Sequence, residues 1–193
     1  MKILVVEPHP DDAFLSLGWH LEKVWAGDEK TILTVYADER RDKEAKAYAD
    51  AVGAGHICLG LSESKMDSPT TSIKAIPELR SKLHELEAEG YDLILFPLGL
   101  QHPDHIRVAV SRPPDAARYV DTPYQTKQKL ADTLLSKTKG MVIESVLYPP
   151  KRKWRHGTLF KSQSLFFHYN AGLGDSLLPE MVLSPVPTSV SDP

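Results

Sequence analysis

Two short clusters of histidine and aspartate contain the side chains of this sequence that are best suited to chemistry. The first is Pro-His-Pro-Asp-Asp at residues 8–12, and the second is His-Pro-Asp-His at residues 102–105. Each cluster follows a short apolar run, at 2–7 and 92–96, that is typical of a buried strand. Burying histidines and carboxylates without partners is costly, so the clusters indicate a binding site.

A metal ion is the simplest ligand for these clusters, because imidazole nitrogen and carboxylate oxygen are ordinary zinc ligands. A catalytic zinc site usually takes three protein ligands and leaves one position for water. The clusters offer more candidates than that: His9, Asp11, Asp12, His102, Asp104 and His105. The surplus favours hydrolysis, since a carboxylate beside the metal can accept a proton from water and a histidine can donate one to the leaving group.

The segments between the clusters predict the elements that position them. Strands are expected at 2–7, 31–36, 56–59 and 92–96, and helices at 13–26, 40–52 and 76–86. This alternation is typical of an α/β layer sandwich with a mostly parallel sheet. Right-handed crossovers place the carboxyl ends of parallel strands on one edge, where ligands bind, so the two clusters are expected to share one site.

The remainder of the chain is less regular in pattern. A helix that begins at Pro103 is expected to break at 112–114, because the two prolines there lack an N–H and clash with the preceding turn. Further strands are predicted at 141–147 and 165–169. The proline-containing tail at 179–193 is expected to be irregular.

Simpler roles are also open to the same side chains. Asp11 or Asp12 alone could cap the helix that follows, but two aspartates in succession exceed what capping needs. His20 is expected to be a surface or packing residue. Nucleotide binding is disfavoured, because the turn after the first strand lacks a glycine-rich loop and its carboxylates would repel a pyrophosphate.

Composition narrows the class of protein. The chain has 193 residues, which is enough for one sizeable domain. Its formal net charge of -3 gives no excess of positive charge of the kind that binds nucleic acid. Its one cysteine, Cys58, excludes a disulfide framework. The first residues show no signal-peptide pattern, and no apolar stretch reaches the length of a membrane span, so a cytoplasmic location is expected.

The two clusters resemble the motif pair of the PIG-L/LmbE-like family of zinc-dependent N-deacetylases. In that family a His-Pro-Asp-Asp motif ends the first strand of a Rossmann-like domain, and a His-x-Asp-His motif follows a later strand. The resemblance implies a Rossmann-like three-layer sandwich. It also implies three metal ligands, which are His9, Asp12 and His105.

The resemblance also implies catalytic roles for the remaining members of the clusters. Asp11 would be the general base for the attacking water. His102 would be the general acid or oxyanion stabiliser, with Asp104 orienting it.

Two segments between the motifs resemble the family's substrate-binding regions. Residues 41–45, Arg-Asp-Lys-Glu-Ala, are similar to its Arg-x-x-Glu-Ala, and residues 59–63, Leu-Gly-Leu-Ser-Glu, are similar to a segment with an aspartate that contacts sugar hydroxyls. Arg41 and Glu63 are therefore the substrate-contact candidates. The chain departs from the family at residues 18–19, where paired glycines are usual, and at 34–39, so the substrate is left open.

These observations give one hypothesis and two alternatives. Residues 1–178 are expected to form a single α/β metal-dependent deacetylase domain that uses Zn2+ or another divalent metal such as Fe2+. It would remove an acyl group, expected to be acetyl, from the amine of an N-acetylglucosamine-like sugar or glycoside. The alternatives are a metal-dependent amidase or esterase acting on a non-sugar substrate and a catalytically inactive sugar- or metal-binding protein. The oligomeric state, including a homo-oligomer, is left open.

Overall fold

The computed structural model describes residues 1–64, 73–100, 102–121, 137–138, 141–147, 159–160 and 180–185. Its strands form one seven-stranded sheet in the order β3-β2-β1-β4-β5-β7-β6. Their bounds are β1 Lys2–Glu7, β2 Glu29–Tyr36, β3 Ala54–Leu61, β4 Leu93–Pro97, β5 Ala117–Tyr119, β6 Met141–Leu147 and β7 Glu180–Pro185. The helices are α1 Asp12–Trp19, the π-helix η1 His20–Val24, α2 Glu39–Ala51, α3 Pro77–Glu87 and α4 Pro103–Ser111.

The sheet is mostly parallel, as the sequence predicts. Strands β1 to β5 pair in parallel, and β7, near one edge, pairs antiparallel with both β5 and β6. The order β3-β2-β1-β4-β5 is that of a doubly wound α/β fold, in which the chain changes direction across the sheet between β1 and β4. Ligands of such folds bind at the carboxyl ends of the strands that flank this switch point.

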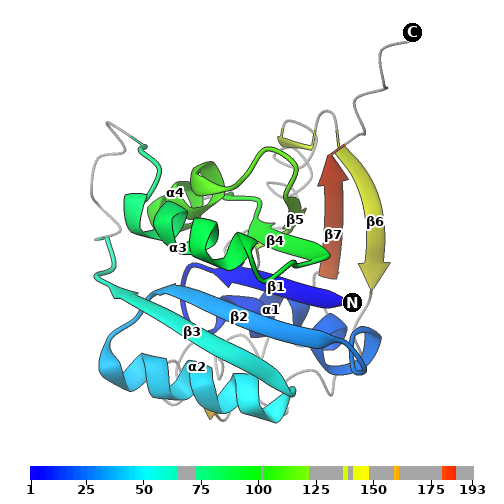
Figure 1. Ribbon diagram of the computed structural model, residues 1–193, viewed down its shortest axis with the longest axis horizontal. Helices are drawn as coiled ribbons and strands as arrows, with labels where there is room; N and C mark the ends of the chain where they lie inside the picture. The colour runs from blue at the N-terminus through cyan, green and yellow to red at the C-terminus, as the bar shows by residue number, and fades with distance from the viewer. Residues whose placement is uncertain are drawn as a thin grey trace, which may run out of the picture.

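Helices cover both faces of the sheet, which gives three layers (Figure 1). Strand β1 shows this best, because its side chains alternate between the two faces and all of them after Lys2 are buried. Ile3 and Val5 pack on the side of α1 and α2. Leu4 and Val6 pack on the side of α3 and α4. The predicted α/β three-layer sandwich is therefore confirmed.

The helix expected at 13–26 consists of two segments, α1 and η1. At their junction the buried carboxylate of Glu180 accepts hydrogen bonds from the backbone N–H groups of Trp19 and His20. A side chain that inserts at the backbone of a helix changes its local geometry, and such π segments are a common result.

The prediction that the tail is irregular from residue 179 is wrong for Glu180–Pro185, which form β7. This strand lies between β5 and β6, with Val182 and Leu183 buried against its neighbours. The burial of these apolar residues favours a strand despite the prolines nearby. The strand predicted at 165–169 lies outside the described residues, and the division of the chain at residue 178 stays a prediction.

Among the described residues, none of the helices combines the length and the apolar character needed to cross a lipid bilayer.

Candidate metal centre

Both histidine and aspartate clusters lie at the switch point of the sheet. The first follows the carboxyl end of β1 and opens α1, and the second follows β4 and opens α4. The rings of His9 and His102 are 4.9 Å apart between centroids, and those of His9 and His105 are 5.3 Å apart. The potential ligand atoms of these three histidines lie within 4.8 Å of one another. The predicted convergence of the two clusters is therefore present in the structure.

Asp12 is the carboxylate that joins the two clusters, and it is completely buried. Its Oδ2 accepts a hydrogen bond of 2.8 Å from the backbone N–H of His9 and lies 3.3 Å from His9 Nδ1. The same oxygen lies 3.1 Å from Nε2 of His105. Burial alone would raise the pKa of the Asp12 carboxyl, but His105 and His9 outweigh burial and hold this pKa well below its usual range.

His105 is held between two carboxylates. Its Nδ1 lies 2.9 Å from Oδ2 of Asp121, and its Nε2 faces Asp12. Sequence reasoning missed Asp121, although it too lies just beyond the carboxyl end of a parallel strand, β5. That position would have been the signal, but β5 has only three residues and was not predicted.

His102 is the N-cap of α4, and its Nδ1 accepts a hydrogen bond of 3.2 Å from the backbone N–H of Asp104. A neutral His102 in this geometry therefore carries its proton on Nε2. Burial, together with the neighbouring His9 and His105, lowers the pKa of the His102 imidazole. Because the lone pair of Nδ1 is engaged and Nε2 carries the proton, this geometry suits hydrogen-bond donation from Nε2 better than metal ligation, which requires a nitrogen lone pair.

The carboxylate of Asp104 lies closer to His9 than to the residue that it was predicted to orient. Its Oδ2 is 3.3 Å from His9 Nε2, 4.0 Å from His102 Nδ1 and accepts a hydrogen bond of 2.9 Å from the backbone of Ser64. Burial would raise the pKa of this carboxyl, but the bonds from His9 and Ser64 lower it to about 2. In this arrangement the backbone of Asp104, rather than its carboxylate, holds His102.

Asp11, the candidate general base, is buried at the start of α1 but makes no capping hydrogen bond, so the simple capping role is not what the geometry shows. Its Oδ1 lies 3.3 Å from the guanidinium of Arg41, which also forms an ion pair with Glu63. Burial, with a smaller contribution from Asp12 and against the attraction of Arg41, raises the pKa of Asp11 to about 6. Both predicted substrate-contact residues are thus connected to the cluster.

A further buried acid, Glu7, supports the first cluster from the end of β1. It accepts hydrogen bonds of 2.9 Å from the backbone N–H of Ala13 and 2.7 Å from the hydroxyl of Thr34. Burial raises the pKa of Glu7 to about 8. These bonds fix the first turn of α1, and with it the position of Asp12.

The predicted ligand set fits a divalent metal ion. His9 and His105 both contact Asp12. The second oxygen of Asp12, Oδ1, is buried and has no hydrogen-bond partner among the described residues. Native proteins rarely leave such an atom unpaired, so the arrangement is consistent with a bound cation. Two imidazoles and one carboxylate are a common donor set of catalytic zinc sites.

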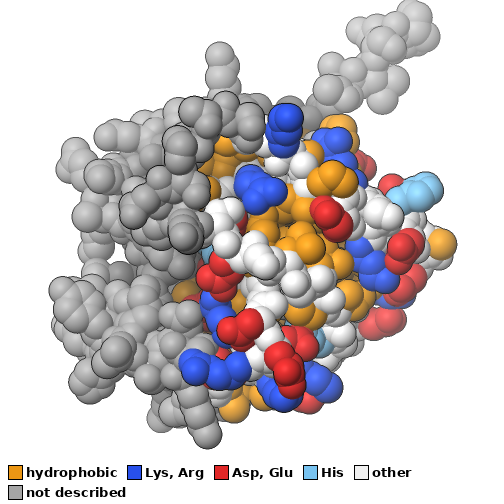
Figure 2. All heavy atoms as spheres, turned by 90° about the vertical axis from the view of Figure 1, so that its left-hand side faces the viewer, with side chains coloured by type: hydrophobic (Ala, Val, Ile, Leu, Met, Phe, Trp, Pro, Cys, Tyr) orange, Lys and Arg blue, Asp and Glu red, His pale blue; other side chains and the backbone are white. Residues whose placement is uncertain are grey.

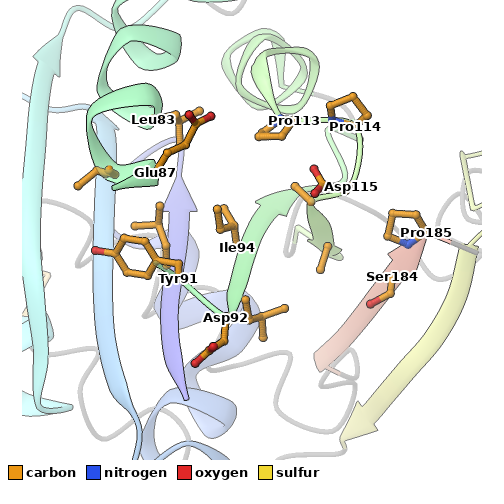
Figure 3. Close-up of a pocket in the computed structure, with 15 residues that line it drawn as sticks. Leu83, Glu87, Tyr91, Asp92, Ile94, Pro113, Pro114, Asp115, Ser184 and Pro185 are labelled. Atoms are coloured by element: carbon orange, nitrogen blue, oxygen red, sulfur yellow. The ribbon is translucent and has the colours of Figure 1, made fainter. Parts of the chain in front are cut away.

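A separate hollow lies elsewhere on the described part of the molecule. It encloses about 690 Å³ between α3, β4 and the segment after α4, and Leu83, Ile94 and Pro113 are among its lining residues (Figure 3). The hollow lies near the amino ends of β4 and β5, whereas the metal centre lies at the carboxyl ends. It therefore does not belong to the candidate site.

No protein-family model matches this sequence, and no curated protein matches it. In fold, the chain is similar to the A40926 pseudoaglycone deacetylase Dbv21, with a TM-score of 0.63, 20% identity and coverage of 95% of this chain and 96% of that one. It is also similar to the zinc-inhibited form of teicoplanin deacetylase Orf2, with a TM-score of 0.60, 15% identity and coverage of 98% and 100%. A third similar structure is N,N'-diacetylchitobiose deacetylase from Pyrococcus horikoshii in complex with its inhibitor MPG, with a TM-score of 0.51, 18% identity and coverage of 100% and 86%.

The chain therefore has the fold of these deacetylases. The predicted resemblance to the PIG-L/LmbE-like family is confirmed at the level of the fold. At these identities the likeness concerns the fold, and a reaction must be argued from the site.

Proposed function

We propose that this chain is a metal-dependent hydrolase that removes an acyl group, expected to be acetyl, from the amine of an N-acetylglucosamine-like sugar or glycoside. The observation that carries the proposal is the junction of His9, Asp12 and His105 at the switch point, with Asp11 and His102 beside it. The similarity in fold to deacetylases supports the same reaction class.

His9, Asp12 and His105 would hold the metal, which we propose to be Zn2+ or another divalent ion such as Fe2+. When bound, such an ion polarises an amide carbonyl and lowers the pKa of water towards ~7. This donor set of nitrogen and oxygen does not by itself select one metal, because affinity alone does not decide which ion a protein takes.

The acid and base chemistry is assigned to the neighbouring side chains. Asp11 would take a proton from the attacking water, and Arg41 keeps its carboxylate in place through a contact of 3.3 Å. His102 would donate a hydrogen bond from its Nε2–H to the developing oxyanion, and the proton that Asp11 has taken from the water would pass to the nitrogen of the leaving amine. The backbone N–H of Asp104 prepares His102 for this role, because it occupies Nδ1.

Recognition of the substrate is assigned to Arg41 and Glu63, next to Asp11. The Glu63 side chain is 43% exposed, whereas that of Arg41 is 12% exposed, so Glu63 is the more accessible of the two. A carboxylate accepts hydrogen bonds from sugar hydroxyls, and the diacetylchitobiose deacetylase has an acetylated sugar in its name. On the part of the surface coloured by type in Figure 2, acidic and basic side chains are interspersed around hydrophobic ones, which suits a small polar substrate better than a nucleic acid.

The first test is the metal content of the purified protein, measured by elemental analysis. About one zinc or iron ion per chain is expected in the wild type, and the ion should be lost in His105→Ala. The matched control is His84→Ala on α3, whose side chain is 85% exposed and remote from the cluster, and which should keep the metal. A wild-type protein that neither contains nor takes up a divalent metal would refute the proposal.

The second test separates the proposed reaction from the alternatives. Acetate release is measured from N,N'-diacetylchitobiose, from an N-acetylglucosaminide and from N-acetylated amino acids. Activity on the sugars is expected, and Asp11→Asn should reduce it by about 10²- to 10⁴-fold while metal content is retained. Activity confined to the non-sugar amides would favour the amidase, and inactivity of the metal-loaded protein on the whole panel would favour a binding protein.

A further inference from the structure

Asp121 is a buried carboxylate that connects three parts of the chain. It lies just after β5, and its side chain accepts hydrogen bonds of 3.1 Å from the backbone N–H groups of both Gly99 and Leu100. Its Oδ2 also lies 2.9 Å from Nδ1 of His105 on α4. The carboxylate thus joins the end of one strand, the loop after β4 and the first turns of α4.

The three contacts determine which nitrogen atoms donate a hydrogen bond to Asp121. An ionised carboxylate only accepts hydrogen bonds, so both backbone N–H groups and the Nδ1 nitrogen must be donors. Nδ1 of His105 therefore carries a hydrogen. The other ring nitrogen, Nε2, faces Asp12 at 3.1 Å, and with Nδ1 engaged by Asp121 it is the nitrogen left to give its lone pair to a metal ion when one is bound.

The loop that contributes two of these donors is itself tightly fixed. Gly99 has a φ of +76°, and a Cβ added there would lie 2.7 Å from the Cβ of Ala109 on α4. The side chain of Lys137 also donates a hydrogen bond to the carbonyl of Gly99. Asp121 is therefore anchored by a rigid loop, which fixes the direction from which it meets the ring of His105.

We propose that Asp121 is a positioning residue that holds His105 in the Nδ1–H tautomer and so presents the lone pair of Nε2 to the metal ion. The inference rests on the proposed function, because it takes His105 to be a metal ligand. Carboxylates that accept the other N–H of a ligating histidine commonly fix its orientation and raise its basicity. Asp121 is not itself a ligand and does not touch the substrate in this role.

Asp121→Asn is the sharpest perturbation, because it keeps the shape of the side chain and changes only its hydrogen-bonding character. An asparagine has one carbonyl oxygen, and its amide nitrogen donates. It cannot accept from Gly99, Leu100 and His105 together as both oxygens of the aspartate do. The expected result is a dissociation constant for Zn2+ that is about 10- to 100-fold higher than in the wild type, measured by competition with a chromophoric chelator.

Asp115→Asn is the matched control, since Asp115 is exposed on the loop before β5 and should leave zinc affinity unchanged. Circular dichroism of the zinc-free proteins establishes that both variants are folded. Equal zinc affinities of a folded Asp121→Asn and the wild type would overturn the inference and leave the proposed function standing. A wild type that binds no divalent metal ion would overturn the proposed function and the inference with it.

A measurement on the wild type keeps the inference testable should Asp121→Asn fail to fold. In 15N-histidine NMR spectra of the zinc-loaded protein, His105 is identified by sequential assignment, because His105→Ala is expected to lose the metal and so to shift the signal of His9 as well. The inference requires a proton on Nδ1 of His105, with Nε2 bound to the metal. A metal-bound Nδ1 with the proton on Nε2 would overturn the inference whatever the variants do.

Discussion

Glu180 provides a test of the fold that does not depend on any proposed activity. It is the first residue of β7 and is buried beneath the junction of α1 and η1. Its carboxylate accepts from the backbone N–H of Trp19 at 2.9 Å and from that of His20 at 3.0 Å. Its Oε2 also lies 2.8 Å from Nδ1 of His20, whose Nε2 lies 2.8 Å from the hydroxyl of Ser145 on β6.

The substitution Glu180→Gln should therefore be costly even though it changes the volume very little. The amide oxygen of glutamine can accept hydrogen bonds in place of one carboxylate oxygen, but its NH₂ group cannot accept from a backbone N–H. One or two of the buried donors on Trp19 and His20 would lose their acceptor. At about 1–3 kcal/mol for each buried unsatisfied group, the expected loss of unfolding free energy is about 2–4 kcal/mol. For a domain of this size that corresponds to a fall in Tm of about 5–15 °C.

The assay is thermal unfolding of the purified proteins, followed by circular dichroism in the same buffer. Glu144→Gln is the control, because Glu144 is exposed on β6, the strand paired with β7. A substitution at an exposed site of this kind should change the unfolding free energy by less than about 0.5 kcal/mol. If Glu180→Gln melts within 2 °C of this control, roughly the effect of 0.5–1 kcal/mol, the carboxylate does not hold the junction in the way argued above.

Three further predictions follow from other parts of the structure. Gly99→Ala should lower the unfolding free energy by about 2–4 kcal/mol, because the positive φ disfavours an alanine and the added Cβ would collide with Ala109. Gly27→Ala is the control, since a Cβ there has nothing within 4 Å and should have little effect. Equal melting temperatures of the two variants would contradict this prediction. Burial raises the pKa of Cys58 to about 11, so its thiolate fraction at pH 8 is about a hundredfold below that of an ordinary thiol. Alkylation of Cys58 by iodoacetamide should therefore be slow in the folded protein and fast once the protein is unfolded. Arg41→Ala removes the cationic partner of Asp11 and Glu63 and should lower kcat/KM for the acetylated sugar about tenfold or more. Arg40→Ala, at an exposed position on the same helix, is the control and should leave kcat/KM within twofold of the wild type.

The elements that the sequence predicts well are those with strong local patterns. Strands β1, β2 and β4 are apolar runs bounded by turns, and α2 and α3 have an apolar face with helical spacing. These elements suffice to place both clusters at one edge, because parallel strands with helical crossovers have a fixed handedness. The general position of the candidate site was therefore predictable from local signals and a topological rule.

The elements that were missed depend on contacts between distant residues. Strand β5 is too short to show any periodicity, and β7 contains a proline and is stabilised by pairing with β5 and β6. His20 was expected at the surface or in packing; it is buried, but its partner Glu180, which lies 160 positions away, was not predicted. A single buried acid or histidine has no local pattern, so its partner becomes apparent only when the sheet is assembled.

The same distinction applies inside the site, where Asp11 and Asp12 are neighbours in sequence and identical in type. Their proposed roles, base and ligand, came from a resemblance, but the structure gives a physical reason for the difference. Asp12 is enclosed by His9 and His105, which favour its ionised form, whereas Asp11 is buried and lies 3.3 Å from its cationic neighbour Arg41. The pKa of Asp12 is accordingly lowered and that of Asp11 is raised to about 6. Adjacent acids whose surroundings separate their pKa values in this way are suited to different tasks, one as a permanent anion and one as a group that exchanges protons near neutral pH.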